Sequence, residues 1–210
     1  MTHCESCGET LETPLVCTVC GVLHAVDPEP TPFGVLGLDP AFEVELAELN
    51  RRLLRFSRKT HPDYFGTADA ETRARAEHNS ALLNAAFELL VDPFRRADHL
   101  VESLGGPSEK DERQMPQAFL MEVLEWNEAL EEARASAPAS DQRGTLAGLE
   151  QELVARRETT MSAVAEGLEP LPARGSSSLT ELRRHLNAVR YLDRALRELR
   201  ALRMEEATAG

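Results

Sequence analysis

A proline at position 62 interrupts what would otherwise be one long helix, and this break constrains the fold more than any other feature of the sequence. Proline lacks a backbone N–H and pushes the residue before it, His61, out of the helical region. The tripeptide His61-Pro62-Asp63 is therefore predicted to form a turn between two helices, over residues 43–59 and 70–91. The sequence indicates a helical hairpin with the histidine and the aspartate at its tip.

The helix before the turn is predicted to be amphipathic. At about 100° per residue, its apolar face comprises Leu46, Leu49, Leu53 and Phe56. Five cations share the opposite face within a sector of roughly 120°: Arg51, Arg52, Arg55, Arg58 and Lys59. A basic stripe alone is most often a solvated face, but this chain has a net charge of −13. Positive charge concentrated against that overall sign suggests an acidic protein partner.

The helix after the turn is rich in alanine and carries the expected packing surface of the hairpin. The candidates for that surface are Ala81, Leu82, Ala85, Phe87, Leu89 and Leu90.

This arrangement resembles the J-domain, the module by which co-chaperones stimulate ATP hydrolysis in DnaK-class chaperones. The resemblance includes the tripeptide, the basic helix, an apolar lead-in at residues 33–38 and the segment 84–87. In that family the loop and the basic face contact the ATPase, so the implied contact residues are His61, Pro62, Asp63, Arg51, Arg52, Arg55, Arg58 and Lys59. Tyr64 and Phe65 follow the tripeptide where general J-proteins often carry a basic residue, which suggests a specialised branch.

Four cysteines near the N-terminus form two C-x-x-C pairs, each followed by a glycine: Cys4, Cys7, Cys17 and Cys20. The two-residue spacing lets one turn aim both sulfurs at one metal, and glycine tolerates the positive φ that closes the turn. The pattern predicts a tetrahedral zinc site, with iron in a rubredoxin-like site as the main alternative. Four protein ligands leave no open position, which favours a structural role over a catalytic one. His3 and His24 flank the site and are not expected to be ligands.

A redox dithiol or a disulfide is less consistent with the pattern, because the pairs are duplicated and a reducing compartment is expected. A segment this short has no core of its own, so metal binding is expected to supply its folding free energy. Residues 27–32, with three prolines, are predicted to be a stiff linker.

Three long helical patterns follow the hairpin region, over residues 116–135, 141–166 and 179–206. Breaks at 136–140 and 167–175 are short, which favours an antiparallel three-helix bundle. A short helix after Asp92 and the boundary signal Gly105-Gly106-Pro107 precede the bundle. We therefore expect an all-α protein with three domains: a four-cysteine module (1–28), a J-domain hairpin (31–105) and a three-helix domain (110–207).

The first helix of the bundle has more apolar surface than one packing seam needs. One stripe, the expected core, contains Phe119, Val123, Trp126 and Leu130. A second stripe on another face is edged by carboxylates and contains Leu120, Met121, Leu124, Glu125 and Glu128. Such a face is typical of a partner-binding patch, although a helix placed between two neighbours would bury both stripes.

Segments 119–125 and 190–193, placed after a J-domain-like region, resemble the HscB family of J-type co-chaperones dedicated to iron–sulfur cluster assembly. The resemblance covers residues 31–206, and the four-cysteine segment resembles an extension found on some members. In that family the bundle binds an IscU-type scaffold, which implies contacts by Leu120, Met121, Leu124, Glu125, Glu128 and Tyr191. Some members carry phenylalanine where this chain has Tyr191, so the hydroxyl is a departure from the pattern.

The resemblance implies a co-chaperone, and not an enzyme, that stimulates an HscA- or DnaK-type ATPase and delivers an IscU-type scaffold to it. The alternative is a general J-protein for unfolded clients, with the bundle as a client or dimerisation platform; a weak homodimer is compatible with both. A metal-dependent enzyme would need titratable groups that converge in a cleft, and this interpretation commits all four cysteines to a closed metal site.

Composition limits the remaining classes. With 42% hydrophobic and 28% charged residues in 210 positions, the chain is long enough to bury a core. Its acidic balance argues against nucleic-acid binding, and a run of about 18 apolar residues, as a membrane span requires, is absent from the sequence. A secretory signal is not apparent, so we expect a cytoplasmic protein, or one of the mitochondrial matrix if the host is eukaryotic.

Overall fold

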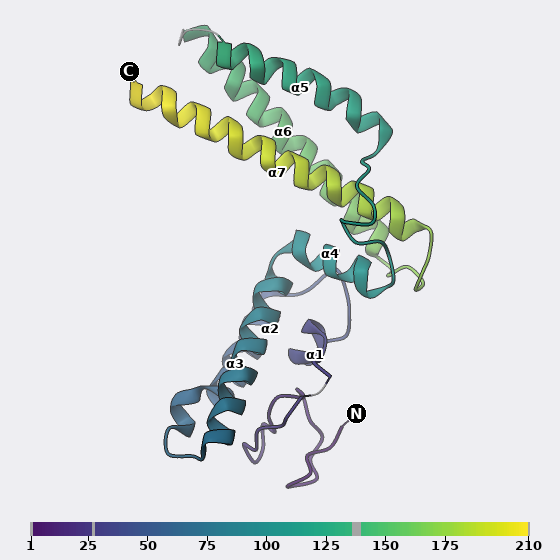
Figure 1. Ribbon diagram of the computed structural model, residues 1–210. Coiled ribbons are helices and arrows are strands. Elements are labelled where there is room, and N and C mark those ends of the chain that lie inside the picture. The colour runs from purple at the N-terminus through teal and green to yellow at the C-terminus, as the bar shows by residue number, and fades with distance from the viewer. Residues whose placement is uncertain (1, 27, 136–139, 210) are drawn as a thin grey trace. The chain divides into compact units, whose positions relative to one another are not determined.

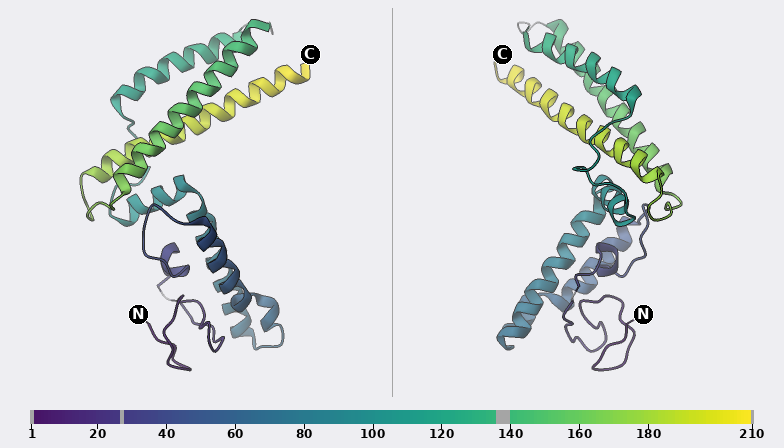
Figure 2. Two further views of the ribbon diagram at one scale, coloured as in Figure 1. Left: turned by 180° about the vertical axis from the view of Figure 1, so that it is seen from behind. Right: turned by 45° about the vertical axis from the view of Figure 1, so that its right-hand side comes forward.

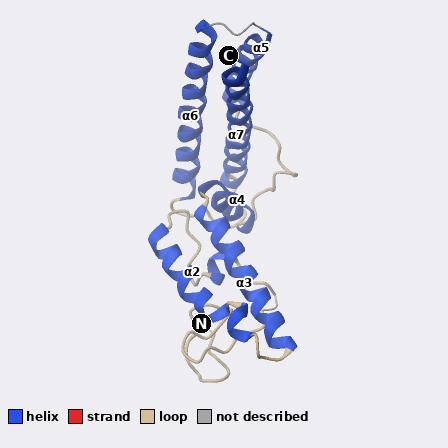
Figure 3. Cartoon of the chain, turned by 90° about the vertical axis from the view of Figure 1, so that its left-hand side faces the viewer, coloured by secondary structure: helices blue, strands red, loops and turns tan. Residues whose placement is uncertain are grey.

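The computed structural model describes residues 2–26, 28–135 and 140–209. Within these residues every named element of secondary structure is a helix (Figure 3). Two isolated antiparallel bridges, His3–Thr10 and Val16–Leu23, lie in the N-terminal segment. The predicted all-α class is confirmed. The elements are α1 (Pro32–Val35), α2 (Leu46–Thr60), η1 (Pro62–Phe65), α3 (Ala70–Val91), α4 (Pro93–Ser103), α5 (Gln117–Ala135), α6 (Ser140–Leu168) and α7 (Ser178–Ala209). Figure 1 labels the seven α-helices.

The chain forms two compact units, residues 1–96 and 97–210. The first contains the four-cysteine segment, α1, α2, η1 and α3; the second contains α5, α6 and α7. Helix α4 begins in the first unit and ends in the second. The three-domain division 1–28, 31–105 and 110–207 stays a prediction.

Helix α2 begins three residues later than its periodicity predicts, because the chain before it is held in another conformation. The carbonyl of buried Phe42 accepts a hydrogen bond from Nε of Arg96 at 2.7 Å. Leu49 and Phe56 are buried as expected, whereas Leu46, at the first position of the helix, is 50% exposed. The prediction that Leu46 packs inward was therefore wrong.

Helix α3 has the predicted length, and the Asp69 carboxylate caps it by accepting a 2.7 Å hydrogen bond from the Thr72 N–H. Its predicted packing surface was mostly wrong. The buried residues are Ala76, Asn79, Leu83, Ala86 and Leu90. Of the predicted set only Leu90 is buried: Leu82, Phe87 and Leu89 are half-buried, and Ala81 and Ala85 are exposed. Apolar residues, counting the alanines, occur on nearly every side of this helix, so periodicity alone does not single out the face that contacts α1 and α2.

The second unit contains the expected antiparallel three-helix arrangement, with α5, α6 and α7 side by side in both views of Figure 2. Its core includes Phe119, Trp126 and Leu130 from α5, and the half-buried Val123 packs against it. α6 and α7 supply the other buried members: Leu146, Leu149, Leu153, Ala188, Leu192, Ala195, Leu196 and Leu199. The predicted break at 136–140 lies, apart from Ser140, outside the described residues.

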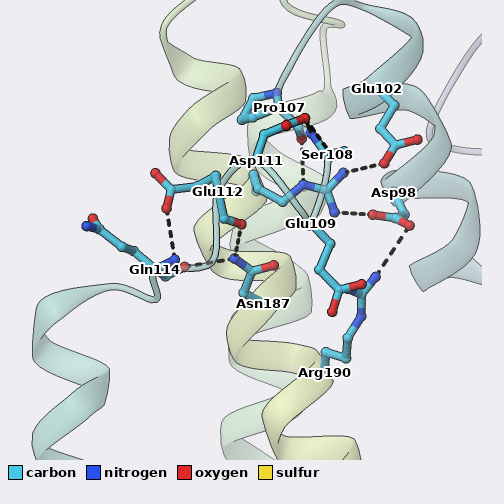
Figure 4. A network of polar contacts seen from close by, with 11 residues as sticks. Asp98, Glu102, Pro107, Ser108, Glu109, Asp111, Glu112, Gln114, Asn187 and Arg190 are labelled. Carbon is cyan, nitrogen blue, oxygen red and sulfur yellow. Dashed lines mark hydrogen bonds and ion pairs between the residues drawn. The ribbon is translucent and has the colours of Figure 1, made fainter.

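The C-terminal part of α4 and the segment between α4 and α5 are joined to α7 by polar contacts, several of which Figure 4 displays. The Arg183 side chain is fully buried, forms ion pairs with Asp98 and Glu102, and donates from Nε to the Pro107 carbonyl at 2.8 Å. Asn187 donates to the carbonyls of Glu112 (2.9 Å) and Gln114 (2.8 Å). These bonds fix the path by which the chain enters α5.

We expect Arg183→Ala to lower the free energy of unfolding of the second unit by about 2 kcal/mol, because Glu102 and the Pro107 carbonyl lose this partner and Asp98 is left with its ion pair to Arg190. The loss is smaller than for a fully buried pair, since Asp98 and Glu102 are 27% and 49% exposed. Urea denaturation measures it. Arg184→Ala, at a side chain that is 30% exposed, is the control. Equal destabilisation by the two substitutions would contradict the special role of Arg183.

Candidate metal centre and docking surfaces

The two C-x-x-C segments adopt the same local structure. In each, the glycine N–H after the second cysteine donates to the carbonyl of the first cysteine: Gly8 to Cys4 at 2.8 Å and Gly21 to Cys17 at 2.9 Å. Gly8 and Gly21 have φ of 76° and 77°, a conformation that side chains other than glycine rarely adopt. The predicted glycine-closed turns are confirmed.

The four sulfurs of Cys4, Cys7, Cys17 and Cys20 lie within 4.8 Å of one another. The Cys4–Cys20 and Cys7–Cys17 sulfur pairs are both 3.6 Å apart, close to the ~3.8 Å edge of a tetrahedron with metal–sulfur bonds of about 2.3 Å. The donor set and its geometry therefore fit a tetrahedral thiolate-bound metal. His3 and His24 are not part of the cluster, as expected.

The local electrostatics favour a thiolate at one cysteine and oppose it at another. The backbone N–H groups of Cys20 and Val19 outweigh desolvation and lower the pKa of Cys17 to about 7. At Cys7 the Glu9 N–H favours the thiolate, but desolvation and the neighbouring sulfurs outweigh it and raise the pKa to about 12. Four thiolates this close repel one another, so a bound cation is the natural source of compensation.

The four-cysteine segment is anchored to the helices of the first unit by buried polar contacts. The Thr13 hydroxyl donates to the Val35 carbonyl at the end of α1 (2.7 Å). The Asn79 side-chain amide on α3 donates to the carbonyls of Leu15 (2.8 Å) and His24 (3.0 Å), and Asn79 is completely buried. Sequence reasoning missed this anchor, because an asparagine in a helix is usually exposed.

The His61-Pro62-Asp63 tripeptide forms the predicted turn. His61 has an extended backbone (φ −63°, ψ 128°) and ends α2, and η1 begins at Pro62. Nδ1 of His61 accepts a 3.3 Å hydrogen bond from the Asp63 N–H, and the imidazole meets the Tyr64 ring edge-on at 6.2 Å between centroids. The side chains of His61 and Asp63 are 51% and 87% exposed, so both are available to a partner.

The basic face of α2 is less uniform than the sequence implies. Arg51, Arg55, Arg58 and Lys59 are exposed. Arg52 is only 23% exposed and donates from Nη1 to the carbonyls of Leu36 (3.0 Å) and Gly37 (2.6 Å). Its guanidinium holds the chain after α1, which leaves it less free for a partner than the other four.

The second stripe of α5 lies at the surface. Leu120, Met121 and Leu124 are 44%, 64% and 58% exposed, and Glu125 and Glu128 beside them are also exposed. The alternative in which neighbouring helices bury both stripes does not hold within the part of the chain that the structure describes. We call the five residues the α5 patch.

Tyr191 of α7 reaches the same face of α5. Its hydroxyl donates to Oδ1 of Asn127 at 2.9 Å, and its ring meets Phe119 edge-on at 5.9 Å between centroids. Asn127 follows Leu120 by seven residues and Leu124 by three, spacings that place all three on one helix face. Burial raises the pKa of Tyr191 above its ordinary value, so the hydroxyl stays a neutral donor. Sequence reasoning did not single out Asn127, although this spacing is visible in the sequence.

Within the described residues, every helix is too short or too polar to cross a membrane.

The family model and the relatives that are similar to this chain all carry the HscB name. A family model described as the HSCB C-terminal oligomerisation domain matches residues 115–200. The co-chaperone protein HscB homolog of Pseudoalteromonas atlantica is 32% identical over 138 residues, 65% of this chain and 77% of that protein. The iron–sulfur cluster co-chaperone protein HscB of Homo sapiens is 31% identical over 140 residues, 64% of this chain and 60% of that protein.

Two solved structures of HscB proteins are similar to this chain. The crystal structure of human co-chaperone protein HscB matches with a TM-score of 0.73 and 25% identity, over 95% of this chain and 98% of that chain. Chaperone HscB from Vibrio cholerae matches with a TM-score of 0.67 over 84% of this chain and 99% of that chain; at 23% identity this likeness concerns the fold.

We expect the purified protein to bind about one Zn²⁺ per chain through four thiolates. Substituting Co²⁺ should give the visible absorption of tetrahedral sulfur coordination, and Cys17→Ser should weaken it. Acidification should release the metal, because protons compete for every thiolate. Thr10→Ser, at an exposed residue of the same segment, is the control and should leave the absorption unchanged. An unchanged spectrum in Cys17→Ser would reject the four-sulfur site.

Proposed function

The chain belongs to the HscB family of co-chaperones, and from this membership we propose that it stimulates the ATPase of an HscA- or DnaK-type chaperone. We further propose that it delivers an IscU-type scaffold to that chaperone during iron–sulfur cluster assembly or transfer. One observation carries the proposal: the exposed His61–Asp63 turn beside a basic helix and the exposed α5 patch lie on one chain, in different compact units.

The chaperone contact is assigned to the turn and to the basic face of α2. His61 and Asp63 are exposed at the end of the hairpin, and Arg51, Arg55, Arg58 and Lys59 are exposed on the helix before it. These cations would steer the protein toward an acidic surface, and their effect on the association rate would fall with added salt. Pro62 contributes by fixing the turn, and Arg52 by holding the end of α1 against α2.

The scaffold contact is assigned to the α5 patch and Tyr191. Leu120, Met121 and Leu124 offer exposed apolar area, and methionine adapts to irregular partner surfaces. Glu125 and Glu128 lie at the edge, where charges select the partner and set its orientation. The hydrogen bond from Tyr191 to Asn127 fixes the aromatic ring beside the patch before any partner arrives, which reduces the conformational entropy lost on binding.

In this mechanism the protein makes and breaks no covalent bond. The second unit holds the scaffold, the first unit contacts the ATPase, and hydrolysis in the chaperone then lets the chaperone grip the scaffold. The relatives carry co-chaperone names, which is consistent with a protein that acts by placing other proteins.

We assign zinc to the four-cysteine centre, because closed tetrahedral thiolate sites favour it and it brings no redox chemistry of its own. It would be held by Cys4, Cys7, Cys17 and Cys20, and its contribution would be to cross-link the two turns.

Thiolates persist in reducing compartments, so we place the protein in the cytoplasm, or in the mitochondrial matrix of a eukaryote.

The test is ATP hydrolysis by the cognate chaperone, with this protein present and the scaffold either added or omitted. We expect stimulation that the scaffold increases synergistically. Stimulation that responds to unfolded polypeptides and not to the scaffold would favour the general J-protein alternative.

His61→Gln is expected to abolish the stimulation and leave scaffold affinity unchanged, because the two sites share no residue. Calorimetry with the scaffold measures the second part. Loss of both activities in this variant would count against independent sites.

Replacing Leu120 and Leu124 together by alanine should weaken scaffold binding by about 2–3 kcal/mol, as truncation of interface hot spots does. Leu46→Ala is a matched control, because this leucine is also about half exposed but lies on α2. Unchanged affinity of the double variant in calorimetry would reject the α5 patch.

A further inference from the structure

The turn that carries His61 and Asp63 packs, through Phe65, against the four-cysteine module, which we define as residues 2–26. Phe65, the last residue of η1, packs against a cluster formed by Val16, Leu23 and Ala76. Val16 and Ala76 are fully buried and Leu23 is 6% exposed. Two of the three buried members belong to the module, so the apolar support beneath Phe65 exists only while the module is folded.

A second link joins the metal-binding turn to the basic helix. Thr18, inside the second C-x-x-C turn, donates from its hydroxyl to Oε1 of Glu12 at 2.9 Å. The other carboxylate oxygen of Glu12 forms an ion pair with Arg55 of α2. The carbonyl of Glu12 also lies so close to Gly37 that a side chain at that position would collide with it. The module therefore contacts both the basic face of α2 and the chain just after α1.

We propose that the metal-loaded module positions the chaperone-contact surface, with Val16 and Leu23 supporting the His61–Asp63 turn through Phe65 and Glu12 orienting Arg55. Metal loading then sets the strength of ATPase stimulation and leaves scaffold binding unaffected. This inference rests on the proposed function, in which the turn contacts the chaperone.

The physical reason is that the module has little apolar interior apart from what it shares with the hairpin. Without metal the two turns lose their cross-link, and the free energy that folds the segment is lost with it. Val16 and Leu23 would leave Phe65, and the buried Asn79 amide would lose its two carbonyl acceptors. The Glu12–Arg55 pair is about half exposed, so it adds little to stability and acts mainly on the orientation of Arg55.

Scaffold affinity is the internal control that separates a loss of positioning from a general loss of folding. The α5 patch and Tyr191 belong to the second compact unit, and none of their residues takes part in the Phe65 cluster or the Thr18–Glu12–Arg55 chain. A general loss of folding would lower both activities, whereas loss of positioning would lower chaperone stimulation alone.

The first experiment compares Val16→Ala with Val19→Ala in the full-length, zinc-loaded protein. Both substitutions remove the same atoms from the same module, but Val16 is fully buried and Val19 is 67% exposed. We expect Val16→Ala to lower ATPase stimulation several-fold while scaffold affinity stays unchanged. Val19→Ala should stimulate the ATPase as the wild type does. Val16→Ile, which keeps a branched apolar side chain beside Phe65, should stimulate it far more than Val16→Ala does. Zinc content, measured with a chromogenic chelator after thiol modification, should be one per chain in all three variants.

The second experiment follows backbone amide chemical shifts by NMR while zinc is removed by a chelator and then restored. We expect the signals of His61, Asp63 and Tyr64 to move on removal and to return on restoration, and those of Leu120 and Leu124 to stay in place. Unmoved signals of the turn would overturn the proposal, as would full stimulation by Val16→Ala. If the wild type stimulates no chaperone, the proposed function fails, whereas the amide shifts still decide whether the module supports the turn.

Glu12→Gln tests the second link without disturbing a buried residue. It should raise the concentration of this protein needed for half-maximal stimulation roughly twofold, the size expected for one exposed ion pair. Its maximal stimulation should be unchanged. Glu71→Gln is the control, because it removes a comparable surface pair with Arg75 on α3. An unchanged half-maximal concentration would overturn the role of Glu12.

Discussion

The helix break at Pro62 is the constraint on which the first unit depends. Because proline disfavours a helical conformation at His61, α2 ends there with an extended residue, and the chain turns through η1 into α3. This one local restriction exposes the imidazole and the carboxylate of Asp63 and turns Phe65 toward the four-cysteine module. A continuous helix would place none of these groups at a tip.

The four-cysteine module and the hairpin depend on each other for different physical reasons. The module contributes four closely spaced sulfurs but little apolar interior, and the hairpin contributes Ala76 and the buried Asn79 amide. A buried amide left without acceptors costs about 1–3 kcal/mol, so Asn79 favours the docked arrangement over a detached one. The module is thus better described as a part of the first unit than as an appendage.

In the second unit, one stripe of α5 is buried in the core, and the other stripe, to which we assign scaffold binding, is exposed. The inner stripe of α5 closes the three-helix core, and the tie through Arg183 and Asn187 fixes how the chain enters that helix. The outer stripe can then remain apolar and exposed without loss of the fold. Leu120 and Leu124 are exposed outside that core, which leaves them available for the scaffold contact that we propose.

Sequence alone determined the features that are set by neighbouring residues: the break at Pro62, the glycine-closed cysteine turns and the two stripes of α5. Tertiary structure decided the features set by distant partners. Helix α2 starts late because Arg96 holds the Phe42 carbonyl, and α3 buries Asn79 because two carbonyls of the module lie opposite it. Local periodicity carries no information about such partners. The face of an alanine-rich helix is chosen only when another segment packs against it.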